Sequence, residues 1–420
     1  MPRRTLTFVF CLVLSYLMGS TAEAQYTPPG ELADRPVDRQ ETVREAADEA
    51  RWRLGVVRVE PYLGLRDLGY ENSSDDRGSG FTATLGAGLT AFLRNGDRVL
   101  WEAHVLPEYI WWPDDSDRNR LGGRYGAGLY GDFNRLSVIL AAGREETQGF
   151  RTPEYEQRVV TRNDHLEADV NLRLTGAFEL FARARDEEIG FEVDDIDDPR
   201  ARMLDTLDRS ERGGRAGVRY RPRSWLSLAV GAERAETEFA QGSLDRSSSG
   251  TYPFFEAALE GNRIYALLDV ALRDLEPEPG SQLPAYDEPA GRILVSLFPD
   301  GRLQPAVYGA RTLLYSAVAG YPYYDEERGG ISLTYRRSRR LSLRSFAEAG
   351  RLDYRPLDGT IADRRDDLLS LGAEVTFDLR FVTLSVEAIR TEYDSNLDVF
   401  DREVTAIRTG VRLAGDLSWL

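Results

Sequence analysis

Apolar and polar residues alternate through much of the chain, from residue 55 to the C-terminus. The pattern is clear in segments 166–174, 226–232, 369–377 and 382–388. In the first of these, the apolar positions are Leu166, Ala168, Val170, Leu172 and Leu174. A period of two is that of a β-strand, whose successive side chains point to opposite faces. Each segment is therefore predicted to be a strand with one apolar face and one polar face.

Two architectures place one face of each strand among apolar groups and the other in water. They are a water-soluble β-sandwich, and a transmembrane barrel with its apolar face in lipid. The connections between segments distinguish the two, because they alternate between short and long. The short ones are 94–97, 133–135, 174–176, 221–224, 261–263, 299–301, 337–339 and 378–380. The long ones are 71–79, 113–120, 145–160, 187–211, 236–250, 275–289, 317–328, 352–366 and 391–403. Tight turns at one end and long loops at the other are typical of outer-membrane barrels. We therefore predict an all-β, transmembrane, antiparallel up-and-down barrel of about eighteen strands, with sixteen as the alternative.

Aromatic residues gather near both kinds of connection, as expected where a barrel crosses the two membrane interfaces. Beside the short turns and at the C-terminal end lie Phe133, Tyr220, Trp225, Phe298, Tyr335, Phe377, Phe381 and Trp419. In or beside the long loops lie Tyr109, Trp111, Trp112, Tyr252, Phe254, Tyr323, Tyr324, Tyr354 and Tyr393.

The N-terminus predicts export from the cytoplasm. A basic start, an apolar run at 6–17 and the small residues around Ala24 are typical of a signal peptide covering 1–24. Residues 25–54 read as a linker followed by a charged helix from Arg39 to Arg53, and 55–420 as the barrel. Two interpretations of this helix stay open: a solvated periplasmic helix, or a segment that folds back into the lumen as a plug. An exported barrel of this kind is expected in the outer membrane, in contact with lipid and lipopolysaccharide.

Charge and composition exclude several classes of function. The chain has 53 basic residues, none of them lysine, against 70 acidic ones, a net charge of -17. Such a charge repels phosphate backbones, so a nucleic-acid partner is not expected. The two histidines, His104 and His165, have no Ser/His/Asp or metal-ligand spacing around them. We expect no enzyme, catalytic residue, metal site or cofactor; a membrane-embedded hydrolase is the alternative, and it would lose activity on His104→Ala or His165→Ala.

Two stretches resemble known proteins. From Ile407 the last strand alternates to Trp419 and Leu420, similar to the C-terminal signal that the outer-membrane assembly machinery reads, although the aromatic residue is penultimate. Residues 54–65, followed by Leu68-Gly69-Tyr70-Glu71-Asn72, resemble the first strand and loop of the type-two β-barrel porins of Gram-negative bacteria. That resemblance implies an outer-membrane barrel and a role in exopolysaccharide export. The strand count and an Arg-bearing lumen are also similar to alginate exporters.

The polar faces are expected to line the lumen. The inward charged positions are Glu167, Asp169, Arg173, Glu179, Arg183, Arg185, Arg215, Arg219, Arg221, Glu233, Arg344, Glu348, Glu374, Glu387, Arg408 and Arg412. The arginines at 183, 185, 215, 219 and 221 form a candidate positive strip for charged solutes. Alternatively, opposite charges pair across strands and hold the wall rigid.

We therefore predict a channel for small hydrophilic solutes or for export of an anionic exopolysaccharide. A closed structural or adhesin-like barrel that acts through its long outer loops is the alternative. It would have a lumen blocked by residues 25–54 or by an infolded loop.

Overall fold

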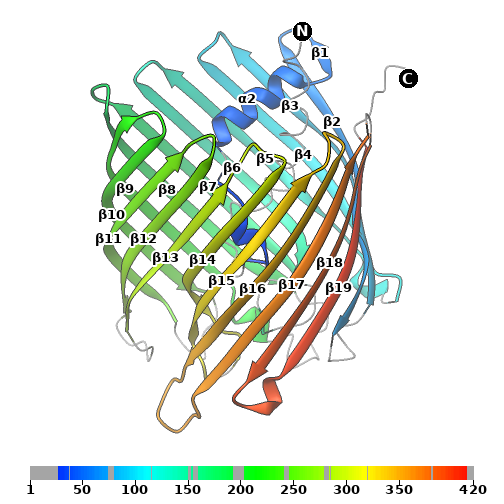
Figure 1. Cartoon of the computed structure of the whole chain (residues 1–420), viewed down its shortest axis with the longest axis vertical. Helices are drawn as coiled ribbons and strands as arrows, with labels where there is room; N and C mark the ends of the chain where they lie inside the picture. Colours follow the sequence, from blue (N-terminus) through cyan, green and yellow to red (C-terminus); the bar gives the residue numbers. More distant parts are fainter. Residues whose placement is uncertain are drawn as a thin grey trace.

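A computed structural model describes most of the chain (Figure 1). The described residues are 27–36, 38–73, 80–114, 116–149, 153–154, 159–192, 203–240, 246–278, 283, 285–318, 320–379 and 382–413. The predicted signal peptide and the last seven residues, which form the end of the C-terminal signal, lie outside these ranges.

The described residues form one antiparallel sheet in which each long strand pairs with its neighbours in the chain. The strands are β1 (Trp52–Leu54), β2 (Val57–Ser73), β3 (Gly80–Asn95), β4 (Val99–Trp111), β5 (Arg120–Phe133), β6 (Leu136–Gly149), β7 (Val159–Arg173), β8 (Phe178–Glu192), β9 (Arg209–Arg223), β10 (Leu226–Phe239), β11 (Ser248–Glu260), β12 (Ile264–Pro277), β13 (Tyr286–Leu297), β14 (Leu303–Tyr315), β15 (Tyr323–Arg336), β16 (Leu341–Arg355), β17 (Arg364–Asp378), β18 (Val382–Ser395) and β19 (Arg402–Leu413). The helices are η1 (Glu31–Ala33), α2 (Arg39–Glu49), η3 (Ser116–Arg118) and η4 (Asp398–Phe400).

Pairing of β19 with β2 closes strands β2 to β19 into an eighteen-stranded ring. The all-β, up-and-down barrel predicted from the alternation is thereby confirmed, at the larger of the two strand counts. The short strand β1 is an addition, because it pairs only with β2 and residues 52–54 were expected to end the helical region. The short turns lie at one end of the barrel and the long loops at the other, called here the short-turn end and the long-loop end (Figure 1).

The two faces of the barrel differ as the alternation predicts. On β4, Trp101 and Val105 are about half exposed on the outside, whereas Leu100 and Glu108 are fully buried on the inside. Large apolar side chains are exposed on almost every strand, an arrangement that a water-soluble monomer rarely shows. An outer face of this kind is suited to lipid.

Only some of the aromatic residues near the loops and turns are exposed on the outer face, where all of them were expected. Exposed aromatics do occur near both ends of the strands, at Trp101, Phe133 and Trp225 toward the short turns and at Tyr109 and Trp111 toward the long loops. The rest of the long-loop set, expected at the membrane interface, is buried: Trp112, Tyr252, Phe254, Tyr323, Tyr324, Tyr354 and Tyr393. That expectation is wrong for these seven residues, because the strand ends that carry them are covered from inside the barrel by infolded loops.

Candidate functional site

The N-terminal segment lies inside the barrel at the short-turn end, where Figure 1 shows α2 across the opening. Asp38 begins the helix by accepting hydrogen bonds from the amides of Gln40 and Glu41. Val43 and Ala47 are buried against a cluster on the inner faces of β3, β4 and β5, made of Phe92, Leu100 and Tyr130. Among the described residues no helix is both long and apolar enough to cross a membrane.

Polar contacts fasten α2 to the same part of the wall. Arg39 donates to Glu167 (2.6 Å) and to the hydroxyl of Tyr130 (3.1 Å). Gln40 accepts a hydrogen bond from Ser137 at 2.9 Å. The helix itself was expected, although it ends at Glu49 and not at Arg53. The expectation that solvent surrounds it is wrong, and the contacts agree with the second interpretation, in which the segment enters the lumen. The sequence pattern indicated this burial only weakly, because the buried residues of the helix are Thr42, Val43 and Ala47 and most of its other residues are charged.

A substitution tests this packing. Val43→Asp places an uncompensated carboxylate among apolar side chains, at a cost on the order of 3 kcal/mol. We expect trypsin to cleave the released helix at its arginines while the barrel stays folded. The measurement is limited proteolysis, followed by electrophoresis of boiled and unboiled samples. Glu41→Ala, an exposed position on the same helix, is the matched control and should stay resistant. Equal resistance of both variants would contradict the packing.

Before α2, residues 27–36 lie against the opposite wall. Strands β12 to β16 lie nine places from β3 to β7 in the ring of eighteen, so the N-terminal segment spans the lumen from side to side. Three inward arginines bind its backbone carbonyl oxygens. Arg328 donates to Thr27 (2.6 Å), Arg344 to Gly30 (2.6 Å) and Arg292 to Leu32 (2.7 Å).

The same wall accepts two side chains of the segment. Leu32 is buried among residues of β12, β13 and β14, namely Tyr265, Leu294, Ala306 and Tyr308. Asp34 forms an ion pair with Arg344 at 3.0 Å. Burial raises the pKa of the Asp34 carboxyl, and the positive charges of Arg344 and Arg292 act in the opposite direction.

The candidate positive strip is a network of ion pairs. Arg215 binds both Glu233 (2.6 Å) and Asp269 (2.9 Å), and Arg219 binds Glu179 at 2.9 Å. The other members are also paired: Arg183 with Asp169, Arg185 with Glu167 and Glu187, and Arg221 with Glu179. Direct cross-strand neighbours account for several of the pairs. The structure therefore agrees with the alternative in which opposite charges hold the wall, although Arg183 and Arg221 keep about half of their side chains exposed.

Of the remaining predicted lumen residues, Arg173 adjoins the candidate strip and the others lie in other sectors. Arg173 is opposite Glu179 in the register of β7 and β8. Arg344 and Glu348 lie on β16, where Glu348 pairs with Arg328 at 2.9 Å. The last group is distributed over β17 to β19: Glu374 accepts from Thr376, Arg408 pairs with Glu71 and Glu387, and Arg412 lies over the ring of Tyr62. The inward charges thus face the lumen from several sides and do not form one strip.

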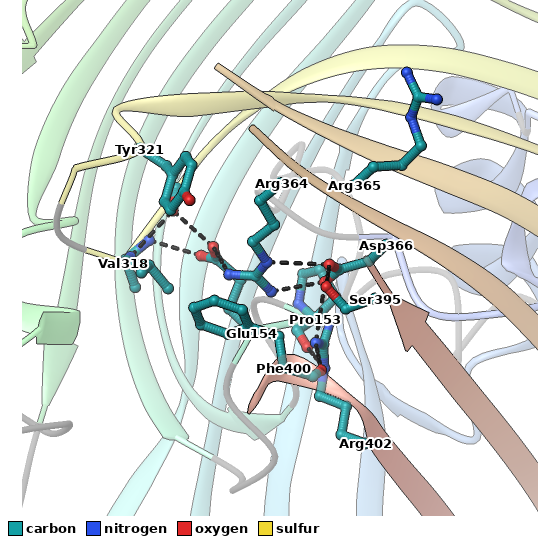
Figure 2. A network of polar contacts seen from close by, with 12 residues as sticks. Pro153, Glu154, Val318, Tyr321, Arg364, Arg365, Asp366, Ser395, Phe400 and Arg402 are labelled. Atoms are coloured by element: carbon teal, nitrogen blue, oxygen red, sulfur yellow. Dashed lines mark hydrogen bonds and ion pairs between the residues drawn. The ribbon is translucent and has the colours of Figure 1, made fainter. Parts of the chain in front are cut away.

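At the long-loop end, a second polar network joins opposite sides of the barrel (Figure 2). Glu154, from the connection between β6 and β7, accepts hydrogen bonds from Ser316 (2.6 Å) and from the amide of Ala317 (2.7 Å). Its carboxylate lies 4.0 Å from Arg364 of β17. The neighbouring carbonyl of Pro153 accepts from Arg402 of β19 at 2.8 Å. We call this set of contacts the outer latch.

Asp366 is the anion at the centre of the outer latch. It accepts two hydrogen bonds from Arg364 (2.6 and 3.0 Å), one from Arg402 (3.1 Å) and one from Ser395 (2.7 Å). Aromatic rings cover the cations, with Tyr354 and Phe400 over Arg364 and Tyr393 over Arg402. Side-chain exposures of 0% for Asp366, 1% for Arg364 and 6% for Arg402 mean that these charges are removed from water.

An apolar cap lies beside the outer latch. Leu204 and Leu207, between β8 and β9, are fully buried against inward residues of the wall, among them Phe181, Tyr252 and Tyr315. The sequence-based interpretation missed both the cap and the outer latch, because it placed these residues in solvated outer loops. A usable signal was the run of aromatic residues at inward strand positions, which needs an apolar partner inside the barrel.

The two histidines, His104 on β4 and His165 on β7, lie in the wall of the barrel. His104 lies 3.6 Å from Glu102, whose carboxylate also accepts from Tyr130. Across these ranges no three His, Cys, Asp or Glu side chains form a group that could hold a metal ion.

Comparison with known proteins identifies the architecture. No family model and no curated protein sequence matches this chain. Its structure is similar to OccD3 (OpdP) of Pseudomonas aeruginosa, with 12% identity, a TM-score of 0.52, and 93% of this chain and 97% of that chain covered. OccAB3 of Acinetobacter baumannii has 12% identity and a TM-score of 0.52 (84% and 99% covered). OpdO of Pseudomonas aeruginosa has 14% identity and a TM-score of 0.51 (84% and 96% covered). At these identities the likeness shows the fold, and the chain is a closed eighteen-stranded antiparallel β-barrel similar to these three structures.

Proposed function

We propose that the protein is an outer-membrane channel for small hydrophilic solutes, narrowed by its own N-terminal segment and by infolded outer loops. The observation that carries this proposal is the polar character of the contacts that hold residues 27–36 and 38–50 in the lumen. Few apolar side chains hold the segment, and most of its contacts are hydrogen bonds to groups that water or a polar solute can replace. The apolar outer face supports a location in the outer membrane, with lipid and lipopolysaccharide as neighbours.

Export of an anionic exopolysaccharide is the finer form of this proposal. It is supported by the resemblance of residues 54–72 and by the inward arginines, whose planar guanidinium groups suit carboxylates. Assembly of the barrel through its C-terminal strand also stays a proposal, because the end of that strand signal, residues 414–420, lies outside the described ranges.

A closed structural barrel is the second candidate. The N-terminal segment in the lumen is the feature expected of it, and in the outer latch one buried ion pair and several hydrogen bonds join the connection at Glu154 to the opposite wall. Such a protein would act through the surface of its long loops and would conduct nothing.

The deciding experiment measures single-channel conductance in planar bilayers, on the mature chain and on a chain that lacks residues 27–50. We expect small or rare conductance steps from the intact protein and steps several times larger from the truncated one. Both samples must first show the mobility change on boiling in SDS that marks a folded barrel. Silence of both folded proteins would contradict the channel and favour the closed structural barrel.

A further inference from the structure

Residues 27–34 contact the wall of β12 to β16 much as a bound peptide contacts a receptor. Carbonyl oxygens of Thr27, Gly30 and Leu32 accept from wall arginines, as does that of Asp34. In return, the amide of Gly30 donates to Glu348 at 3.3 Å. Fixed partners for the backbone, independent of side-chain identity, are what distinguish a peptide site from a general polar surface.

Side-chain selectivity comes from two positions. Leu32 fills an apolar pocket whose members include Tyr265 and Tyr308, and the carboxylate of Asp34 pairs with Arg344. Arg35 follows, its guanidinium 5.3 Å from the centre of the Tyr265 ring. The wall is therefore selective for an apolar side chain at one position of the bound segment and for an acidic side chain two residues later.

Gly30 adds a steric condition. Its φ of +83° lies in the left-handed region, and a β-carbon there would lie 2.7 Å from the ring of Phe346. The wall thus accommodates a chain with glycine at this turn, whereas the same chain with alanine would clash with Phe346 and would be strained in its backbone.

We propose that this part of the wall, formed by Tyr265, Arg292, Tyr308, Arg328, Arg344 and Phe346, is an exchangeable peptide-binding site of the channel. Its ligand class is a short extended peptide with a glycine turn, an apolar side chain and a carboxylate. Residues 27–34 are its resident ligand, and a peptide of the same chemistry displaces them. The inference rests on the proposed function only in placing the site on a solute path, because the binding itself does not require conduction.

Exchange requires that the resident segment detach and rebind. When the segment leaves, Arg328 keeps its ion pair with Glu348. Arg292 and Arg344, in contrast, have their hydrogen bonds with the segment itself. A free peptide that restores these bonds therefore replaces the resident ligand with an equivalent set of contacts.

The experiment uses the full mature chain with Leu32→Ser and Asp34→Asn, which weakens the resident ligand, and a synthetic peptide with the sequence of residues 27–36. Added on the short-turn side in a planar bilayer, the peptide should block conductance in a saturable way. A fluorescent copy of the peptide should also bind the detergent-solubilised variant. Peptides carrying Gly30→Ala, or the pair Leu32→Ser and Asp34→Asn, should bind about tenfold more weakly, as should a channel carrying Arg292→Gln and Arg344→Gln.

Conductance block and peptide binding, measured separately, distinguish the peptide-site proposal from the channel proposal. A conducting channel that neither binds nor is blocked by the peptide would overturn the peptide site and leave the channel standing. Binding that is equal for the native and the Gly30→Ala peptides would also overturn it, because the turn would then be irrelevant. Selective binding by a silent protein would support the site and contradict the channel.

Discussion

Replacing Asp366 by alanine is expected to open the long-loop end of the barrel. The substitution leaves the guanidinium groups of Arg364 and Arg402 buried without the carboxylate that both share. Breaking a buried pair in this way typically costs about 3–5 kcal/mol. The arginines can regain water only if the loops around Glu154 and Phe400 move apart. We therefore expect larger conductance steps, and a lower temperature for conversion of the folded to the unfolded band in SDS.

The next residue provides the control for this prediction. Asp367 pairs with Arg351 on the outer surface, where the two side chains are 62% and 46% exposed. An exposed pair contributes about 0–1 kcal/mol, so Asp367→Ala should leave conductance and the conversion temperature close to those of the native protein. If Asp366→Ala behaved like Asp367→Ala, the outer latch would not hold the loops.

The wall of the barrel could be predicted from sequence because the alternation carries two kinds of information. It identifies each strand, and it states which residues share a face. Glu167 and Asp169 were thus assigned to the inside from the apolar character of Leu166 and Val170 alone. The turn lengths supplied the rest, since alternate short and long connections place neighbouring strands in antiparallel order.

The contents of the lumen could not be predicted in the same way. Whether Arg215 is an unpaired charge or an ion pair depends on the register of β9 against β10, which brings Glu233 directly opposite. Asp269, its second partner, lies on β12, and nothing local to either residue indicates the contact. The pairing of charges is therefore a property of the closed barrel and not of any one segment.

The infolded segments were missed for a related reason. Tyr109 and Tyr324 both lie near long loops, yet one is exposed to the outside and the other is fully buried. The two tyrosines differ because they lie on opposite faces of the barrel wall, and because only the inner face is covered by an infolded loop. A loop that returns into the lumen carries no periodic pattern, so Leu204 and Glu154 looked like ordinary loop residues.

The outer latch is also expected to respond to pH through Glu154. Burial raises the pKa of this carboxyl above its ordinary value of about 4.5, while Ser316, Arg364, the amide of Ala317 and Arg402 act in the opposite direction. The docked loop thus binds a proton more readily than the released loop does. By linkage, the contribution to docking is fully present below about pH 4.5 and is lost as pH rises through the raised pKa. The channel should therefore be more closed in acid.

Single-channel recordings from about pH 4 to about pH 8 would measure this effect as an open fraction that rises several-fold with pH. Glu154→Gln removes the titrating group but keeps an oxygen that can accept from Ser316 or Ala317, so its open fraction should be nearly constant over this range. Glu392→Gln, at an exposed carboxylate paired with Arg390 on the outer face of β18, should retain the native response. An unchanged pH response in the Glu154 variant would assign the titration to another group and would leave Glu154 as a neutral hydrogen-bond acceptor in the outer latch.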